Sequence, residues 1–230
     1  MPEAELPDVQ IPGLSWETLS HRQVMAELVG AGWVPCGVGD WALGLRSPEG
    51  SLVARVCPFD PAYAAFVDLC RECAGNRWLP RVELAASLEG GGSVVFLEYV
   101  ASVEPAVAEQ AAKQIGNQWQ DGSGDAEFEA VRRAAQAIDA RYRESVPWWA
   151  GFDLNAGNVR RAADGRLVLI DLFCMHGASL YAQILEDAAA VHRRIPRERM
   201  RYALEIPYIA RESSTAEIAA LAAAWARGAG

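Results

Sequence analysis

One short polar segment and the hairpin after it constrain this chain more than any other feature. Asp153 and Asn158 stand five residues apart, and Asp171 ends an apolar run thirteen residues after Asn158. The residues between them, 159–170, have the pattern of a β-hairpin, with the two-residue turn signal Asp164-Gly165 at its tip. Because a hairpin returns the chain to its starting point, we expect Asp153, Asn158 and Asp171 to converge. Three oxygen ligands of this kind suit a hard cation such as Mg²⁺.

Two other interpretations of this segment stay open. The run from Asp153 to Asn158 is also compatible with an ordinary polar turn before a hairpin, with Asp171 as a strand-end residue. The pattern Asp-x-Asn-x-Gly also suggests a calcium loop. Its glycine falls at the fifth position, however, and its twelfth residue is Asp164, whereas a calcium loop needs glycine at the sixth position and glutamate at the twelfth.

The order Asp-Leu-x-x-Gly-Asn, then Ile-Asp-x-Phe, resembles the catalytic core of the protein-kinase-like superfamily, and its aminoglycoside phosphotransferase branch more than protein kinases proper. The resemblance implies an ATP- and Mg²⁺-dependent phosphotransferase. It implies that Asp153 orients or deprotonates the acceptor hydroxyl and that Asn158 holds a metal. Asp171 would hold the metal that bridges the nucleotide phosphates.

Upstream residues fit the N-terminal lobe of the same superfamily. Gly37 and Gly39 match the first two glycines of its phosphate-covering loop, where a missing Cβ lets backbone N–H groups approach phosphates, and Ala42 replaces the third. Arg55, on the expected strand Leu52–Val56, stands where the family usually has lysine. By resemblance Arg55 would clamp phosphates, since arginine stays charged and can fork onto their oxygens. The alternative is a solvated cation on an exposed strand.

Two further segments follow in the family's order. The helix expected from Asp60 to Cys73 corresponds to the regulatory helix, whose acid falls near Asp68 or Glu72, and the choice between them stays open. An apolar strand ending in Glu98 resembles the hinge strand. The resemblance implies that adenine bonds to the carbonyl of Glu98 and the amide of Val100.

The resemblance covers residues 33–175 and implies an α+β class: a bilobal protein-kinase-like fold with an abbreviated, mainly helical C-terminal lobe. We expect a tail at 1–13, an N-terminal lobe with a helix and an antiparallel sheet at 14–98, and a mainly helical lobe with the catalytic loop at 99–230. Outside the regulatory helix, helical patterns occupy four regions: 20–31, 101–120, 125–143 and from 178 onward.

Several departures from the family pattern keep a second function open. Gly151 stands two residues before Asp153, where the family usually has histidine, and no Ala-Pro-Glu run follows. About 57 residues remain after Phe173, so the platform that binds protein substrates in conventional kinases is expected to be missing. Gly151 and Arg55 favour a non-catalytic pseudokinase or nucleotide-sensing module, and the intact Asp-Asn-Asp set opposes it.

Composition narrows the partners. The chain has 21 Lys and Arg against 30 Asp and Glu, a formal charge of −9. This disfavours nucleic acid as a partner and is compatible with a cationic small substrate, although an acidic surface also serves solubility. We expect a small-molecule or protein acceptor and no membrane association, because no stretch reaches about 18 apolar residues. The oligomeric state stays open.

The cysteines indicate a compartment. Five cysteines without disulfide-rich spacing fit a reducing cytoplasm, and residues 1–10 are too acidic and proline-rich for a signal peptide. Cys70 and Cys73 have Cys-x-x-Cys spacing, but there is no second such pair and the three histidines are scattered. We therefore expect these two cysteines to pack as small apolar residues and not to bind zinc.

Overall fold

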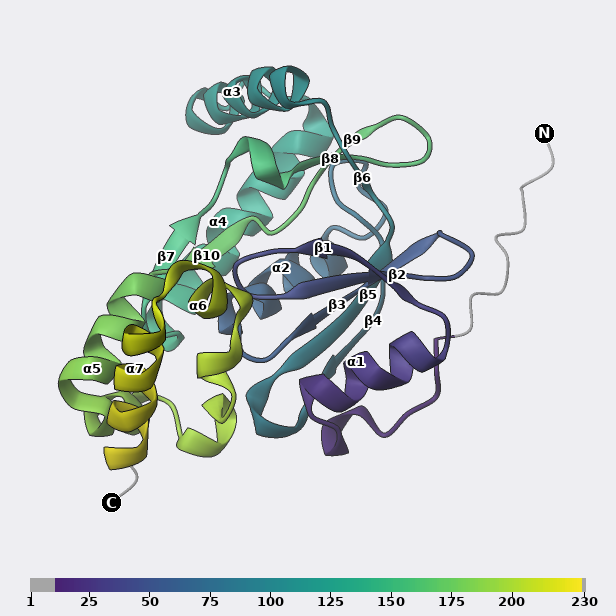
Figure 1. Cartoon of the computed structure of the whole chain (residues 1–230). Coiled ribbons are helices and arrows are strands. Elements are labelled where there is room, and N and C mark those ends of the chain that lie inside the picture. The colour runs from purple at the N-terminus through teal and green to yellow at the C-terminus, as the bar shows by residue number, and fades with distance from the viewer. Residues whose placement is uncertain (1–10, 229–230) are drawn as a thin grey trace. The chain divides into compact units, whose positions relative to one another are not determined.

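The computed structural model describes residues 11–228, so the first ten residues of the expected tail lie outside it (Figure 1). The chain divides into two compact units. The described parts of the first unit are 11–59, 83–99 and 196–218, and those of the second are 60–82, 100–195 and 219–228. Against the expected boundary at residues 98 and 99, residues 60–82 belong to the second unit and 196–218 to the first.

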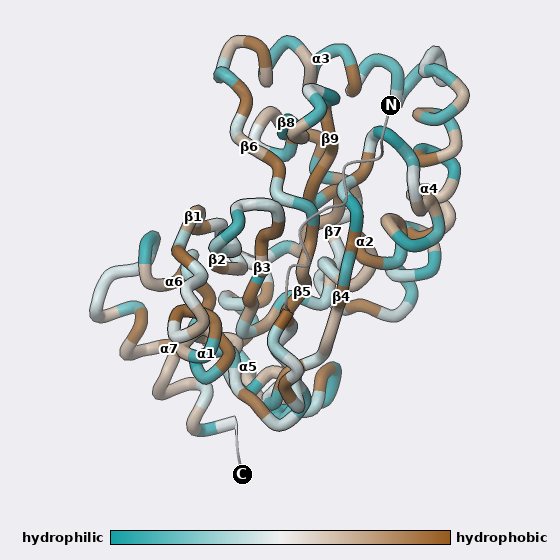
Figure 2. Tube along the Cα trace, turned by 90° about the vertical axis from the view of Figure 1, so that its right-hand side faces the viewer, coloured by the Kyte–Doolittle hydropathy of each residue, from teal (hydrophilic) through white to brown (hydrophobic). Residues whose placement is uncertain are grey.

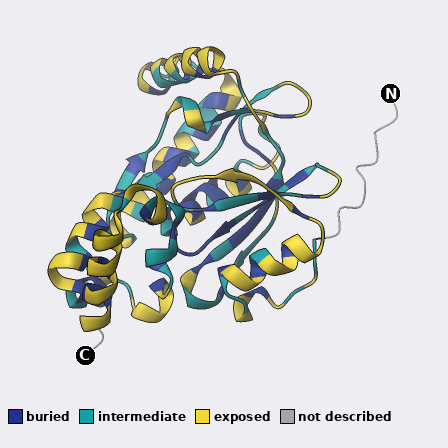
Figure 3. Cartoon of the chain, in the orientation of Figure 1, coloured by how far each residue is buried: buried dark blue, intermediate teal, exposed yellow. Residues whose placement is uncertain are grey.

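The first unit is built on a five-stranded sheet in the order β1-β2-β3-β5-β4, and the neighbours β1, β2, β3 and β5 pair antiparallel. The strands are β1 (Val34–Val38), β2 (Leu43–Arg46), β3 (Leu52–Cys57), β4 (Val82–Ser87) and β5 (Ser93–Glu98). β3 and β5 agree with the strands expected from the sequence. β3 and β5 are rich in apolar residues (Figure 2), and they are the most buried strands of this sheet (Figure 3).

Helix α1 (His21–Gly30) packs on one face of this sheet (Figure 1). It begins at a capping box, in which Ser20 and Gln23 satisfy each other's backbone N–H groups. Val24 and Leu28 lie in one apolar cluster with buried strand residues such as Ala54 and Phe96. Burial of this face holds the helix in place, as the helical pattern at 20–31 predicted.

The last segment of the first unit lies against the η2 turn (Glu89–Gly91). It contains η4 (Arg197–Met200), η5 (Ala203–Glu205) and α6 (Pro207–Glu212). Gly90 and Gly91 have φ values of 77° and 87°, which side chains rarely adopt. A Cβ atom at Gly91 would also overlap the backbone of Arg199. The two glycines therefore let η4 pack closely against the η2 turn.

The second unit is mainly helical and carries two small sheets. Its helices are α2 (Pro61–Glu72), α3 (Pro105–Asp121), α4 (Ala126–Ser145) and α5 (Gly177–Arg194), and α7 (Thr215–Arg227) runs into it from the first unit. One sheet has the order β6-β8-β9 and the other pairs β7 with β10. The strands are β6 (Ala101–Ser102), β7 (Trp149–Phe152), β8 (Val159–Arg161), β9 (Leu167–Leu169) and β10 (Phe173–Met175).

The α+β class expected from the sequence is therefore confirmed, and so are the helices expected at 60–73 and 125–143. The helix expected at 101–120 begins only at Pro105, because Ala101 and Ser102 form β6 and pair with β8. Cys70 is buried in α2, in agreement with a packing role. Within residues 11–228, no helix is both long enough and apolar enough to cross a membrane.

Candidate active site

The hairpin expected at 159–170 is present, with a longer turn than predicted. Its strands β8 and β9 pair antiparallel. The amide of Gly165 donates to the carbonyl of Ala162, and the amide of Ala162 donates to the carbonyl of Arg166, both at 3.0 Å. Gly165 has φ 89°. The turn thus has three residues and not two: a hydrogen-bonded turn followed by a left-handed glycine. Asp164 stabilises it by accepting from the amide of Arg166 at 3.1 Å.

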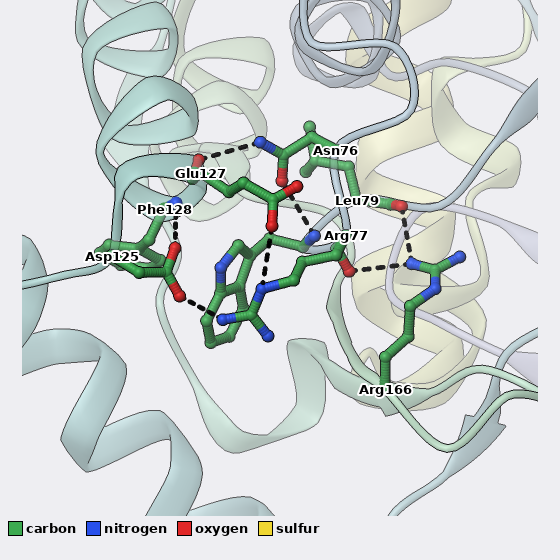
Figure 4. A network of polar contacts seen from close by, with 8 residues as sticks. Asn76, Arg77, Leu79, Asp125, Glu127, Phe128 and Arg166 are labelled. Atoms are coloured by element: carbon green, nitrogen blue, oxygen red, sulfur yellow. Dashed lines mark hydrogen bonds and ion pairs between the residues drawn. The ribbon is translucent and has the colours of Figure 1, made fainter.

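A network around the loop after α2 fixes the second strand of the hairpin (Figure 4). Arg166 donates from Nη1 to the carbonyls of Arg77 and Leu79 at 2.9 and 3.1 Å. The amide of Leu169 donates to the carbonyl of Trp78 at 2.8 Å. Arg77 in turn forms ion pairs with Asp125 and Glu127 at the start of α4 (Figure 4). Residues of the loop after α2 therefore hold the second strand of the hairpin in place.

The ends of the hairpin meet as predicted. The amide of Ile170 donates to the carbonyl of Asn158 at 2.9 Å. The side-chain nitrogen of Asn158 donates to the backbone carbonyls of Asp153 at 2.9 Å and Asp171 at 3.0 Å. A single carboxamide thus joins both flanks of the hairpin, and it brings Asp153, Asn158 and Asp171 together.

These contacts also determine which way the Asn158 amide points. A backbone carbonyl can only accept a hydrogen bond, so two carbonyls around one end of the carboxamide require the NH₂ group there. The oxygen Oδ1 must then lie at the other end. Oδ1 of Asn158 is therefore not used in the bonds that hold the loop together.

Asp153 is held at its backbone and at both side-chain oxygens. Its amide donates to the carbonyl of Leu172 at 2.9 Å. Its Oδ1 accepts from the side chain of Asn155 at 2.7 Å, and its Oδ2 accepts from Asn158 at 3.3 Å. The sequence interpretation overlooked Asn155 as an orienting residue. Its signal was a second amide two residues after the carboxylate, which is the spacing of a short side-chain hydrogen bond in a turn.

Asp171 has a left-handed backbone conformation, with φ 51°. This region is disfavoured for residues with a Cβ, by about 1–2 kcal/mol, although aspartate occurs there more often than most residues. Such strained positions concentrate at functional sites. The chain then enters β10, where Phe173 pairs with Phe152 of β7, so both flanks of Asp171 are fixed.

The thiol of Cys174 reports the charge at this site. Burial, followed by the nearby carboxylates of Asp153 and Asp171 and a smaller contribution from Asp60, raises the pKa of Cys174 to about 11. Two independent carboxylates therefore act on the same small volume. A bound cation would offset that concentration of negative charge.

Gly151 occupies the position where the family usually has histidine, and the structure gives a reason. Its φ is 91°, and a Cβ atom there would lie 3.0 Å from Nη2 of Arg143. Arg143 pairs with Asp139 at 2.9 Å, and Asp139 also accepts from the indole nitrogen of Trp149 at 2.7 Å. The exposed Arg143 side chain could shift to make room for a Cβ atom, so the positive φ is the feature that favours glycine at 151.

A small pocket opens beside Asp153, with a volume of about 10 Å³, roughly the room that one water molecule needs. Its walls are mostly apolar and come from α3 and the hairpin, with the polar groups of the DLNAGN run at one side. The lining residues are Ala112, Ile115, Asp153, Leu154, Asn155, Asn158, Val159, Leu169, Ile170 and Leu172. The pocket is too small to bind an acceptor molecule.

In the first unit, the strand register places Arg55 in line with Gly44 and Gly37 on the neighbouring strands. Gly37 pairs with Gly44, Gly44 with Arg55, and Arg55 with Val95, so these four residues share one face of the sheet. Buried Ala54 belongs to the opposite face, under α1. Arg55 therefore lies beside a strip without side chains. Gly44 was not singled out from the sequence, because only the strand register reveals it.

The glycine-rich loop (residues 37–44) does not need its first two glycines for its own folding. The amide of Gly39 donates to the carbonyl of Ala42 at 2.9 Å and closes the turn. An added Cβ would meet nothing within 4 Å at Gly37 and only the Ala42 carbonyl oxygen at 3.6 Å at Gly39. Packing within the unit therefore does not require glycine at either position. Glycines at these positions leave the backbone N–H groups uncovered by side chains, which is what a phosphate-covering loop needs.

The two residues expected to bond adenine flank the boundary between the units. Glu98 ends β5, opposite Leu52, and Val100 is the first residue of the next segment of the second unit. Between them, the amide of Tyr99 donates to the carbonyl of Ser51 at 2.8 Å. The chain leaves the sheet at this hydrogen bond.

The two candidate acids of the regulatory helix both bond to α4. Nη2 of Arg141 lies 3.4 Å from Asp68 and 3.2 Å from Glu72. The hydroxyl of Tyr142 donates to Asp68 at 2.8 Å, and burial together with this bond raises the pKa of Tyr142. Within the second unit these acids therefore fasten α2 to α4.

The chemistry of the converging residues fits Mg²⁺. In the part of the chain that the structure describes, no three His, Cys, Asp or Glu side chains cluster as a metal cage. Mg²⁺ rarely uses such cages, and it takes one or two carboxylates together with water and substrate phosphates. The carboxylate of Asp171 and the Oδ1 of Asn158 are donors of that kind.

Comparison with known proteins gives distant structural similarity alone. No family profile and no curated protein sequence matches the chain. Among solved structures, the aminoglycoside phosphotransferase APH(3'')-Id from Streptomyces rimosus aligns over 90% of this chain and 99% of its own, with 14% identity and a TM-score of 0.35. A MAP kinase from Leishmania major aligns over 88% of this chain and 65% of its own, with 11% identity and a TM-score of 0.32. The similarity to protein-kinase-like structures that the sequence predicted is present, and at these scores it identifies no activity.

Proposed function

We propose that the protein is an ATP- and Mg²⁺-dependent phosphotransferase, which transfers the γ-phosphoryl group to a hydroxyl of a small-molecule or protein acceptor. One observation carries the proposal: the Asn158 amide binds the backbone of both Asp153 and Asp171. These bonds bring the two aspartates and Asn158 together before any ligand binds. Phosphoryl transfer depends mainly on such positioning and on charge neutralisation.

Each of the three residues has a distinct role in the proposal. Asp171 and Asn158 hold Mg²⁺, which neutralises the charge of the nucleotide phosphates. Asp153 orients the acceptor hydroxyl and accepts its proton. Asn155 bonds to one oxygen of Asp153 and so limits the rotation of the carboxylate.

The first unit supplies nucleotide contacts in the same proposal. Arg55 binds phosphate oxygens with charge-assisted hydrogen bonds, which are among the stronger polar contacts. Gly37 and Gly39 offer backbone N–H groups to the phosphates. The Glu98 carbonyl and the Val100 amide bind adenine. The formal charge of −9 favours a small or cationic acceptor over nucleic acid.

A second candidate function is a nucleotide-sensing module without catalysis. The glycine at position 151 and the arginine at position 55 favour it, because both differ from the catalytic pattern. The two candidates make the same prediction for nucleotide binding and differ in turnover.

Thermal unfolding with ATP tests the proposal. ATP with Mg²⁺ should stabilise the protein more than ATP with a chelator. At a concentration 100 times Kd, the Mg²⁺ complex should stabilise the protein by about 2.7 kcal/mol relative to ligand-free protein. Asp164→Asn is a matched control, because this carboxylate lies in the hairpin turn and forms an ion pair with Arg166 there. Equal stabilisation with and without Mg²⁺ would reject the metal site. Slow ATP hydrolysis that is lost in Asp171→Asn supports the enzyme, and Mg²⁺-dependent binding without turnover supports the sensing module.

A further inference from the structure

The tip of the glycine-rich loop is bonded to a segment far away in the sequence. We name residues 196–212 the C-terminal strap; they comprise η4, η5 and α6. The amide of Tyr208 donates to the carbonyl of Asp40 at 2.8 Å. Nη2 of Arg211 donates to Oδ1 of the same aspartate at 2.5 Å. Asp40 directly follows Gly39, so both bonds hold the turn of the loop. All of these residues belong to the first unit.

One anchor fixes the strap to the η2 turn. Glu89 forms an ion pair with Arg201 and accepts from the hydroxyl of Tyr202 at 2.7 Å. The amide of Arg201 donates to the carbonyl of Gly90 at 3.1 Å. Met200 is fully buried beside these contacts. Hydrogen bonds, an ion pair and the burial of Met200 thus fix the strap upstream of Tyr208 and Arg211, the residues that bond to Asp40.

A second anchor joins the strap to α1. Glu205 lies 3.2 Å from Nε2 of His21 and 2.6 Å from Nη2 of Arg22. The His21 ring is buried and packs edge-on against Tyr202, with ring centroids 5.0 Å apart. Ile206, the next residue, is 1% exposed. The strap is therefore fixed immediately before α6, the helix that contains Tyr208 and Arg211.

Apart from the strap, the loop is held by its own Gly39–Ala42 hydrogen bond and by Cys57, whose thiol lies 2.9 Å from the carbonyl of Trp41. β1 is an edge strand in which all five residues are exposed. Asp40 and Arg211 are also exposed, with 56% and 47% of their side-chain surface accessible, and an ion pair at such exposure adds little to global stability. A backbone hydrogen bond to an anchored segment still restricts where the turn can lie. We therefore expect the strap to affect the position of the loop and not the stability of the fold.

We propose that Tyr208 and Arg211 are positioning residues, which hold the glycine-rich loop over the nucleotide phosphates through Asp40. The inference rests on the proposed function and adds to it a specific device for nucleotide affinity. Tyr208 acts through its backbone amide, so Arg211 is the side chain that mutation can test.

Two measurements on the full-length protein separate this inference from the proposed function. Hydrogen exchange of the peptide that covers 36–45, without nucleotide, reports the tie between strap and loop. ATP titration with Mg²⁺ reports its consequence. Arg211→Ala should speed exchange of the loop and raise the ATP Kd about two- to fivefold, while Arg211→Lys restores part of both. Arg197→Ala is the matched control, since the side chain of this exposed strap arginine forms no hydrogen bond or ion pair within residues 11–228.

A double-mutant cycle identifies the partner. If Arg211 acts through Asp40, the variant with both Asp40→Ala and Arg211→Ala should bind ATP no more weakly than the weaker single variant. Loop exchange in Arg211→Ala equal to that in Arg197→Ala would overturn the inference, and so would an unchanged ATP Kd in a protein whose wild type binds ATP. If the wild type binds no nucleotide, the proposed function fails, and the exchange measurement alone decides whether the strap holds the loop.

Discussion

The polar segment at 153–158 and the glycine-rich loop are held in opposite ways. In the first, the Asn158 amide joins the backbone carbonyls on both sides of the hairpin, and the carboxylate of Asp153 is bonded at both oxygens. In the second, an exposed edge strand ends in a turn that is closed by one backbone bond, contacted by the Cys57 thiol and bonded to the strap. The difference indicates that the polar segment is held by more side-chain hydrogen bonds than the glycine-rich loop. Substitutions in the polar segment should therefore have the larger effects.

The largest effects are expected at the two carboxylates. Asp171→Asn keeps a residue that tolerates a left-handed backbone and removes the charge, so it should abolish Mg²⁺-dependent ATP binding. Asp153→Asn should leave ATP binding nearly intact and lower phosphoryl transfer by about 10²- to 10⁴-fold, as for a lost general base. ATP titration and single-turnover transfer measure the two effects. Equal loss of binding in both variants would reject the division of roles.

Asn158 should come next, with an effect on stability as well as on activity. Asn158→Ala removes the side chain that bonds to both carbonyls, and the loss of these bonds to partly buried acceptors costs about 1–3 kcal/mol. Asn155→Ala, in which an exposed amide loses its bond to Asp153, should cost less. Urea unfolding compares the two variants. If Asn155→Ala were as destabilising as Asn158→Ala, the central role of Asn158 would be wrong.

Arg55 should have a moderate effect that is confined to binding. Arg55→Ala should weaken ATP binding about tenfold, the value of a lost charge-assisted hydrogen bond. Arg55→Lys should keep part of the affinity, because the charge remains and the fork is lost. Calorimetric titration of the three proteins measures this. An unchanged Kd in Arg55→Ala would mean that the arginine does not contact the nucleotide.

The smallest effect concerns the thiol of Cys174. Burial and two neighbouring carboxylates raise its pKa to about 11, so the neutral thiol dominates at pH 8. Asp153→Asn removes one negative charge and should lower that pKa, so that more thiolate forms and alkylation at pH 8 becomes a few times faster. Mass spectrometry of the Cys174 peptide gives the rate, with the exposed Cys36 as internal reference. No change relative to Cys36 would place Asp153 too far away to act on the thiol.

Local patterns in the sequence were enough for the regular elements. The strands β3 and β5 and the helices α1, α2 and α4 were all expected, because apolar periodicity and capping residues are local signals. β6 was missed, since Ala101 and Ser102 carry no strand signal and pair only with distant β8. The hairpin turn was predicted one residue too short, because Asp164-Gly165 fits both a two-residue turn and the end of a three-residue turn.

The candidate site likewise has one part that the sequence predicted and other parts that only the three-dimensional structure reveals. The convergence of Asp153, Asn158 and Asp171 was predicted from spacing alone, and the structure brings them together. The alignment of Gly44 with Arg55 depends on strand register, which the sequence does not contain. The strap was unpredictable for a stronger reason: Arg211 and Asp40 are 171 residues apart. The roles assigned to all of these residues stay predictions.

Metal binding tests the central claim most directly. Mn²⁺ can replace Mg²⁺ as a paramagnetic probe, and electron paramagnetic resonance counts its free and bound forms in the presence of ATP. Wild type and Asp164→Asn should bind Mn²⁺ together with ATP, and Asp171→Asn should bind it at least about tenfold more weakly, because the loss of a charged ligand costs 1.4 kcal/mol or more. Equal Mn²⁺ binding in wild type and Asp171→Asn would contradict the site proposed here.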